Sequence, residues 1–464
     1  MPASMTPRPR FDARQRLIML LLLGAGFMLS VDFSILNVAL PDVGAGVGLD
    51  LRDLPWIASA YALPAAGFTL LFGRLGDLFG RRRMFVSGLA LLIGASLLGG
   101  LASSSELLLT ARALQGLATA MTIPASLSLL TTTFAEGAQR DRALGLNGAL
   151  LSGGFTVGAL LGGALVSLLS WRAAFFVNVP VAATILVLTP FAIAESRRPE
   201  RVELDLPGAV TVTAGLLAAV YAVIEQELLL GVVGAALLAA FWAIELRAEA
   251  PLAPVRILRR PTVKWGNFAG FAIFTMEPAA IYMMTLYLQN VLGLTPLQTG
   301  LIFGIPGLAS VSAGVLAGRM IGRVGVRAVL VAGMTVQALA TLPLAFLGDT
   351  RLALLIAVPA LFVGFFGHVA AIVAYTVTAT SGLPDDEQGL ATGLTSMTQQ
   401  VALTVGIPIL GSVAATQSVE LTGIHLALGA NAAAVLVAVA CVWFGLRPRR
   451  ERRAELAVAP ARSF

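Results

Sequence analysis

The chain has very little of the residue types on which much enzyme chemistry depends. Its 464 residues include one cysteine, Cys441, and one lysine, Lys264. A lone cysteine excludes a disulfide framework and a thiolate metal site. The lysine follows Arg-Pro-Thr-Val and not a glycine-rich loop, which excludes a phosphate-cradling ATP site, and no other lysine can form a Schiff base. We therefore expect no cofactor, no metal site and no enzyme activity.

Charged residues are also scarce, at 12% of the chain against about a quarter in soluble domains. Apolar residues make up 57% and gather in fourteen charge-poor stretches, each long enough to cross a bilayer as a helix. These stretches are 17–37, 54–72, 84–102, 107–130, 143–169, 173–193, 206–224, 228–246, 266–290, 298–319, 328–347, 353–376, 390–415 and 424–446. Because a backbone in lipid must satisfy its own hydrogen bonds, the sequence predicts an all-α polytopic membrane protein with fourteen transmembrane helices.

Basic residues are distributed unevenly between the gaps. Of the 31 lysines and arginines, only Arg52, Arg172 and Arg351 lie in gaps on one side, and Arg112 lies within a span. The others lie in the alternate gaps and near the two ends. Since positively charged loops stay in the cytoplasm, both termini are predicted to be cytoplasmic. The basic pI then reflects topology and contact with anionic lipid, not nucleic-acid binding. High Ala, Gly and Arg usage with a single lysine suggests a GC-rich bacterial genome, so the expected location is the bacterial inner membrane.

The polar gaps divide the chain into parts. The longest, 194–205 and 247–265, bracket the seventh and eighth spans and leave two sets of six, the count expected of an internally repeated transporter. We expect a cytoplasmic N-terminal segment (1–16), an N-terminal six-helix bundle (17–196), a linker with two additional transmembrane helices (197–262), a C-terminal six-helix bundle (263–446) and a cytoplasmic arginine-rich tail (447–464).

A similar motif in each half supports the internal repeat. The loop after the second span reads GRLGDLFGRRR (Gly73 to Arg83), and the loop after the tenth reads GRMIGRVGVR (Gly318 to Arg327). Gly322 stands where an aspartate equivalent to Asp77 would be expected, so the second copy is weaker.

Several motifs resemble those of one transporter family. The GRLGDLFGRRR loop matches the cytoplasmic signature of the major facilitator superfamily. Motifs similar to those of its fourteen-span drug:proton antiporters are VDFSILNVALP (Val31 to Pro41), RALQGLATA (Arg112 to Ala120), WRAAFFVNVP (Trp171 to Pro180), YLQNVLGLTPLQTG (Tyr287 to Gly300) and GLATGL with a following QQ (Gly389 to Gln400). The resemblance implies a major facilitator fold: two six-helix bundles plus two extra central helices.

Two departures from the family pattern bear on function. The fifth-span antiporter motif normally has Gly-Pro before its glycine pair, whereas this chain has Gly158-Ala159. The thirteenth span usually has Arg before Gln, and here Gln399 precedes Gln400.

Three full charges lie well inside predicted spans: Asp32, Arg112 and Glu277. A charge at the bilayer centre costs about 2.5–3.5 kcal/mol on insertion scales, so such residues normally face a cavity and act. Loss of hydration favours the neutral form of a carboxyl group, which can then exchange a proton for a cationic substrate. We expect these three residues to couple transport to protons. Each residue also has an alternative role. Asp32 could be an interfacial carboxylate, Arg112 a structural hydrogen-bonding hub, and Glu277 a member of an ion pair inside the bundle.

Further polar and aromatic residues in the spans are candidates for contact with cargo. The expected substrate-binding residues are Asp32, Glu277, Asn37, Tyr61, Gln115, Tyr282, Gln399 and Gln400. His368, in the twelfth span, fits either a packing residue or a proton relay.

Two glycine-containing motifs have structural interpretations. The resemblance implies a cytoplasmic conformational latch at Gly73, Arg74, Asp77, Gly80 and Arg81. In the fifth span, Gly154, Gly158 and Gly162 repeat every fourth residue beside Gly163, a spacing that permits close helix contact.

Without an ATP site, transport must draw on an ion gradient. The leading hypothesis is proton-coupled export of a lipophilic, cationic drug or antibiotic by a monomer. One alternative keeps the fold and changes cargo or direction: a metabolite or lipid exporter, or an uptake symporter, which Ala159 keeps open. Another is a transport-inactive membrane sensor or a membrane-embedded enzyme.

Overall fold

The computed structural model describes residues 11–50, 53–134, 138–196, 205–225, 227–248, 251, 255–380, 383 and 385–447, and these contain helices and no strand. The α-helices are α1 (Ala13–Val47), α2 (Pro55–Phe79), α3 (Arg81–Gly100), α4 (Ser105–Thr133), α5 (Ala138–Leu168), α6 (Ala173–Phe176), α7 (Asn178–Ala192), α8 (Leu206–Glu225), α9 (Leu228–Glu245), α10 (Pro261–Leu286), α11 (Pro296–Val324), α12 (Val326–Thr341), α13 (Leu354–Thr380), α14 (Asp385–Ala415) and α15 (Glu420–Gly445). Short helical turns are η1 (Val255–Arg259), η2 (Tyr287–Val291), η3 (Leu342–Phe346) and η4 (Arg351–Ala353).

Each predicted apolar stretch coincides with helix, the sixth with α6 and α7 together. Within the described residues, eleven helices are long and apolar enough to cross a membrane. A twelfth is α2, if its two parts, which meet at 49°, form one span. Shorter apolar helical stretches, Gly153–Leu168 and Pro207–Val223, lie in α5 and α8. The all-helical, multi-pass membrane architecture is confirmed, and the count of fourteen spans stays a prediction.

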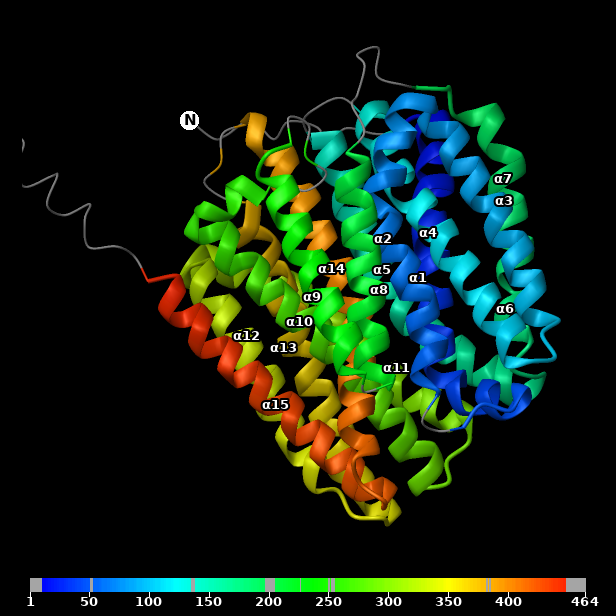
Figure 1. Cartoon of the computed structure of the whole chain (residues 1–464), viewed down its shortest axis with the longest axis vertical. Helices are drawn as coiled ribbons and strands as arrows, with labels where there is room; N and C mark the ends of the chain where they lie inside the picture. Colours follow the sequence, from blue (N-terminus) through cyan, green and yellow to red (C-terminus); the bar gives the residue numbers. More distant parts are fainter. Residues whose placement is uncertain are drawn as a thin grey trace, which may run out of the picture.

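The helices form two groups with α8 and α9 between them (Figure 1). In the first group, α1 packs against α4, α5 and α7, and α4 packs against α2 and α3. In the second, α10 packs against α13, α14 and α15, and α12 packs against α13 and α15. We call these groups the N-half (α1–α7) and the C-half (α10–α15). Residues 1–10 of the predicted N-terminal segment (1–16), residues 197–204 of the predicted linker and residues 448–464 of the predicted tail (447–464) lie outside the described residues.

The buried apolar cores differ between the two ends of the molecule. One core, which we call the shared core, joins both halves and includes Ile35, Phe175, Tyr282 and Leu428. Two other cores each stay within one half. The N-half core includes Ile18 to Leu29 of α1, and the C-half core includes Ala269 and Ile273 of α10. The halves therefore pack together at one end, the contact end, and have separate cores at the other, the separated end.

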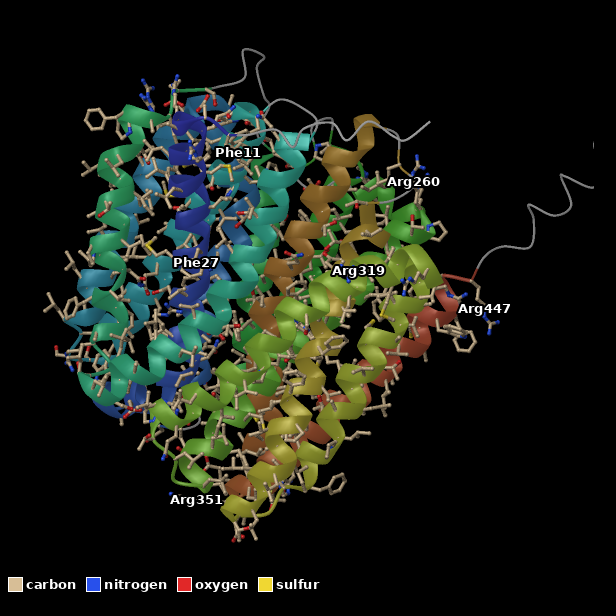
Figure 2. The ribbon with its side chains drawn as sticks, turned by 180° about the vertical axis from the view of Figure 1, so that it is seen from behind. Phe11, Phe27, Arg260, Arg319, Arg351 and Arg447 are labelled. Atoms are coloured by element: carbon tan, nitrogen blue, oxygen red, sulfur yellow. The ribbon has the colours of Figure 1, made fainter. Side chains whose placement is uncertain are left out.

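The packing of α5 against α11 also differs between the contact end and the separated end. A Cβ added to Gly300 would lie 2.5 Å from the carbonyl oxygen of Ala159, so backbone meets backbone at the contact end. Further along α11, an added Cβ on Gly314, Gly318 or Gly322 has no described neighbouring atom within 4 Å. The halves therefore diverge along α11. The separated end carries the start of α1, and in Figure 2 Arg351 lies at the opposite end from Phe11 and Arg260.

Helix α8 contacts both halves. Thr213 Oγ1 donates a hydrogen bond to the Gly67 carbonyl of α2 at 3.0 Å, and Ser412 Oγ of α14 donates to the Val223 carbonyl at 2.7 Å. Apolar residues of α8 also pack between these two helices. Helix α9 packs on α8, so the extra pair covers one seam between the halves.

Candidate functional site

The first polar cluster surrounds Asp32 in the N-half. The Asp32 side chain is fully buried, and Arg112 Nη1 lies 3.3 Å from its Oδ2. Gln115 Nε2 donates to Asp32 Oδ1 at 3.3 Å, and Asn178 Nδ2 donates to the same oxygen. Donors from two other helices, α4 and α7, thus converge on a carboxylate of α1. The structure therefore encloses the Asp32 carboxyl group within the helices of the N-half, and its depth in the membrane stays a prediction.

Arg112 holds the cluster together. Its Nε donates to the Ile57 carbonyl of α2 at 3.1 Å, and its Nη1 donates to Gln115 Oε1 at 2.8 Å. The guanidinium lies over the Tyr61 ring, 4.4 Å from its centroid. Arg112 is therefore both the ion-pair partner of Asp32 and a hydrogen-bonding hub. We call Asp32, Arg112, Gln115 and Asn178 the N-cluster. Its one carboxylate and one guanidinium balance.

The second polar cluster surrounds Glu277 in the C-half. Gln337 Nε2 of α12 donates to Glu277 Oε2 at 2.8 Å, and His368 Nδ1 of α13 lies 4.0 Å from the same oxygen. Glu277, Gln337 and His368, which we call the C-cluster, are 8%, 1% and 8% exposed. Among the described residues, no lysine or arginine lies within ion-pair distance of Glu277. The alternative of an ion pair thus leaves only the histidine, which carries charge only when protonated.

Each cluster lies at the boundary between the shared core and the core of its own half. On α1, Leu29 belongs to the N-half core and Val31 to the shared core, with Asp32 beside them. On α10, Glu277 lies between Ile273 of the C-half core and Ala279 of the shared core. The two carboxylates therefore occupy the same level, just on the separated side of the contact between the halves.

The clusters also draw on corresponding helices. Each has a carboxylate from the first helix of its half and a basic side chain from the fourth, Arg112 in α4 and His368 in α13. The third helices contribute Ser96, which accepts from Gln115, and Gln337. The last helices contribute Asn178 and Asn431, the latter donating to the Met276 carbonyl at 2.6 Å. This repetition is what an internally duplicated transporter would show.

The remaining predicted binding residues are spread more widely. Asn37 donates to the Phe33 carbonyl of its own helix, and Tyr282 is buried in the shared core. Gln399 is half-buried in α14. The side chain of Gln400 lies outside the described residues. Sequence reasoning did not assign Asn178 or Gln337, and the available signal was a polar amide within an otherwise apolar helix.

The latch residues lie at the separated end and pair within the N-half. Arg81 Nη2 is 2.7 Å from Asp77 Oδ1, one helical turn away. Gly80 between α2 and α3 has φ 116°, a conformation that favours glycine. Gly73 approaches Pro124, and the Arg74 side chain lies outside the described residues.

Glu195 was missed from the sequence and completes this region. Its carboxylate accepts from the backbone N–H groups of Arg82 and Arg83 at 3.0 and 3.2 Å, at the start of α3. An anion at a helix N-terminus is favoured by the helix dipole. Glu195 thus ties the segment after α7 to the start of α3.

The fifth-helix glycines allow close helix contact. A Cβ on Gly154, Gly158 or Gly162 would come within 3 Å of backbone oxygens of α1. Gly163 faces the Pro296 carbonyl instead, across the seam between the halves.

Comparison with known proteins places these features in a family. The chain matches the model described as Major Facilitator Superfamily over residues 22–407. It is 35% identical to the cephamycin export protein CmcT of Amycolatopsis lactamdurans, over 88% of this chain and 87% of that protein. It is 34% identical to the puromycin resistance protein pur8 of Streptomyces alboniger, over 87% and 82%. The multidrug resistance protein Stp of Mycobacterium tuberculosis is 33% identical, over 87% and 76%.

Solved structures show the same fold. A POT family transporter, crystallised with 5-aminolevulinic acid, gives a TM-score of 0.71 at 14% identity and covers 95% of this chain and 98% of its own. The nucleoside transporter NupG gives 0.66 at 10% identity, covering 93% and 100%.

Proposed function

Because this chain belongs to the Major Facilitator Superfamily, and because its relatives include named antibiotic and multidrug exporters, we propose that it exports lipophilic, cationic drugs or antibiotics in exchange for protons. It does so by alternating access across the bacterial inner membrane. The fourteen helical stretches are its transmembrane spans, the two six-helix sets with boundaries at 17–196 and 263–446 are its moving bundles, and the monomer is the working unit.

The orientation follows from the arginines. The separated end carries Arg82 and Arg83 at the start of α3, so the positive-inside rule assigns this end to the cytoplasm. With the halves in contact at the other end, this conformation faces inward. Both chain termini are then cytoplasmic, and cargo enters from the cytoplasm or the inner leaflet.

The observation that carries the proposal is the pair of buried carboxylates, Asp32 and Glu277, one in each half at the level where the halves part. In this conformation the Asp32 carboxyl group is paired with Arg112. Protonation from the periplasmic side would release Arg112 from that pair and change the packing of α1 against α4. An alternation between ion pair and protonated acid couples a proton to a helix movement.

The latch acts at the cytoplasmic end. Asp77 and Arg81 pair within one half here, where the halves are apart. In the outward-facing state, the same loop would meet the cytoplasmic end of the C-half, and the Asp77 carboxylate would accept hydrogen bonds there. The fifth-helix glycines supply the close contact between α1 and α5 during this movement.

The export direction separates this proposal from uptake by symport. Purified protein in proteoliposomes is given an inward-acidic pH gradient and a lipophilic cation outside, with external pH recorded. For inside-out protein, antiport predicts uptake of the cation with proton release, whereas symport predicts cation movement in the same direction as protons. Asp32→Asn is the control that should abolish both signals. Proton-independent flux in the unaltered protein would overturn the proposal.

A growth-inhibition panel in a pump-deficient bacterium identifies the cargo class. Protection against cationic antibiotics, and none against neutral ones of similar lipophilicity, is the expected result. Protection against neither class would favour a metabolite or lipid as cargo.

A further inference from the structure

The two buried clusters differ in charge. The Asp32 carboxylate is paired with Arg112, whose charge is permanent. Glu277 has no such partner among the described residues, and its basic neighbour His368 lies 4.0 Å away, beyond hydrogen-bonding distance. An ionised, buried carboxylate without a cation is costly, so the C-cluster is complete only when Glu277 is protonated or a cation joins it.

Unused hydrogen-bond acceptors surround the same carboxylate. Gln337 Oε1 and His368 Nδ1 are buried and have no hydrogen-bond partner among the described residues. Gln337 donates its Nε2 to Glu277, so the oxygen of the same amide lies beside that hydrogen bond. A neutral imidazole with its proton on Nε2 offers Nδ1 as an acceptor. Buried acceptors without donors are rare, because each loses its hydration without replacement.

Aromatic rings line one side of the cluster. Phe274 and Phe365 meet the His368 ring edge-on, with centroids 6.1 and 6.2 Å away. Phe365 in turn packs against Phe155 of the N-half, at 6.2 Å. The cluster therefore lies next to the contact between the halves, where a bound molecule would affect the packing of the N-half and of the C-half.

We propose that Glu277, Gln337 and His368 bind the ammonium group of a primary or secondary amine cargo. The carboxylate supplies the opposite charge, and Gln337 Oε1 and His368 Nδ1 accept the N–H donors. A quaternary ammonium satisfies the charge and leaves both acceptors unpaired, so the site selects for N–H groups and not for charge alone. Because the site serves the export of cations proposed above, Glu277 takes the cargo and Asp32 takes the proton.

Three probes of matched shape separate these contributions: 4-phenylbutylammonium, its trimethylammonium analogue and the neutral 4-phenylbutanol. Binding is measured by calorimetry on the full chain in lipid nanodiscs. The unaltered protein should bind the primary ammonium about tenfold or more tighter than the trimethyl analogue, since hydrogen bonds to charged groups are the stronger ones. Glu277→Gln should weaken both cations by about 30-fold or more and leave the alcohol unchanged.

His368→Phe keeps the ring and removes the acceptor. It should reduce the preference for the primary ammonium to about threefold while the trimethyl analogue binds as before. His425→Phe is the matched control, because His425 lies near the start of α15 and its Nε2 pairs with the Leu347 carbonyl, outside the C-cluster. It should leave the binding of all three probes unchanged. If His368→Phe weakens all three probes equally, or none, the acceptor role is refuted.

Proteoliposome transport distinguishes failure of the site from failure of the proposed function. Proton-driven movement of both cations without a preference would refute the ammonium site and leave cation export standing. Movement of the neutral alcohol alone would refute cation export itself. Unchanged cation binding in Glu277→Gln, together with an altered pH dependence of transport, would make Glu277 a proton carrier and overturn the ammonium site.

Discussion

Asp32 and Arg112 form an ion pair that is closed to water: the oxygen–nitrogen distance is 3.3 Å, and the exposed fractions of the two side chains are 0% and 1%. The pair joins α1 to α4, and Arg112 continues the link to α2 through the Ile57 carbonyl. Asn178 adds α7, so a change of protonation at Asp32 would affect four helices of the N-half.

Asp32→Asn should abolish proton-coupled export, because an amide cannot exchange the proton. It also leaves Arg112 buried without a counter-charge, and breaking a buried pair costs about 3–5 kcal/mol, so the unfolding temperature should fall as well. The double variant Asp32→Asn, Arg112→Gln removes both charges and should regain much of that stability without regaining export. Export by either variant would remove Asp32 from the mechanism.

Arg112→Lys should support export at a rate below that of the unaltered protein. Lysine keeps the positive charge, and it lacks the planar fork with which Arg112 reaches Ile57, Gln115 and Asp32 together. Initial export rates in inverted vesicles measure the effect, and a rate equal to that of the unaltered protein would show that charge alone suffices.

Asp77→Asn should slow turnover about tenfold and change cargo affinity less than about twofold, since it weakens a conformational state and not a binding site. The physical change is loss of the charged partner of Arg81, which lies 2.7 Å away. Asp349→Asn, at an exposed position of the contact end, is the matched control. A parallel fall in affinity and turnover would contradict the latch interpretation.

Gly158→Ala should destabilise the protein by about 1–3 kcal/mol and reduce export, because overpacking forces neighbours apart. The new Cβ would lie 2.6 Å from the Val31 carbonyl oxygen, one residue before Asp32. Gly153→Ala in the same helix meets no described atom within 4 Å and should leave the unfolding temperature and the export rate unchanged. Equal effects of the two substitutions would show that α1–α5 packing is not the cause.

Bound cargo should not protect cysteines placed in α8 from reaction with maleimide. After Cys441→Ala, single cysteines at the exposed Leu217 and the buried Leu216 report on the two faces of the helix. Leu216 packs toward α2 and α14, so it should react slowly with maleimide, with or without cargo. Cargo-dependent protection at Leu216 would place the seam covered by α8 on the transport path.

The sequence by itself determined where the helices lie and which charges are unusual. A bilayer requires long apolar stretches with internally satisfied backbones, so composition alone marks them. The same rule identifies Asp32, Arg112 and Glu277 as unusual, because a charged side chain in the membrane costs free energy and normally has a function. Loop arginines indicated topology, and the Gly73 to Arg83 motif indicated the family.

Only the tertiary structure decided the partners. Asp32 meets Arg112 from 80 positions away and Asn178 from 146, and Gln337 meets Glu277 from 60. Each of these contacts depends on how whole helices rotate and pack, which apolar stretches of similar composition do not specify. The same holds for the end at which the halves touch, since alternating access requires one sequence to support more than one packing. That is why Asp32 with its guanidinium and Glu277 without one looked equivalent in the sequence and differ in the fold.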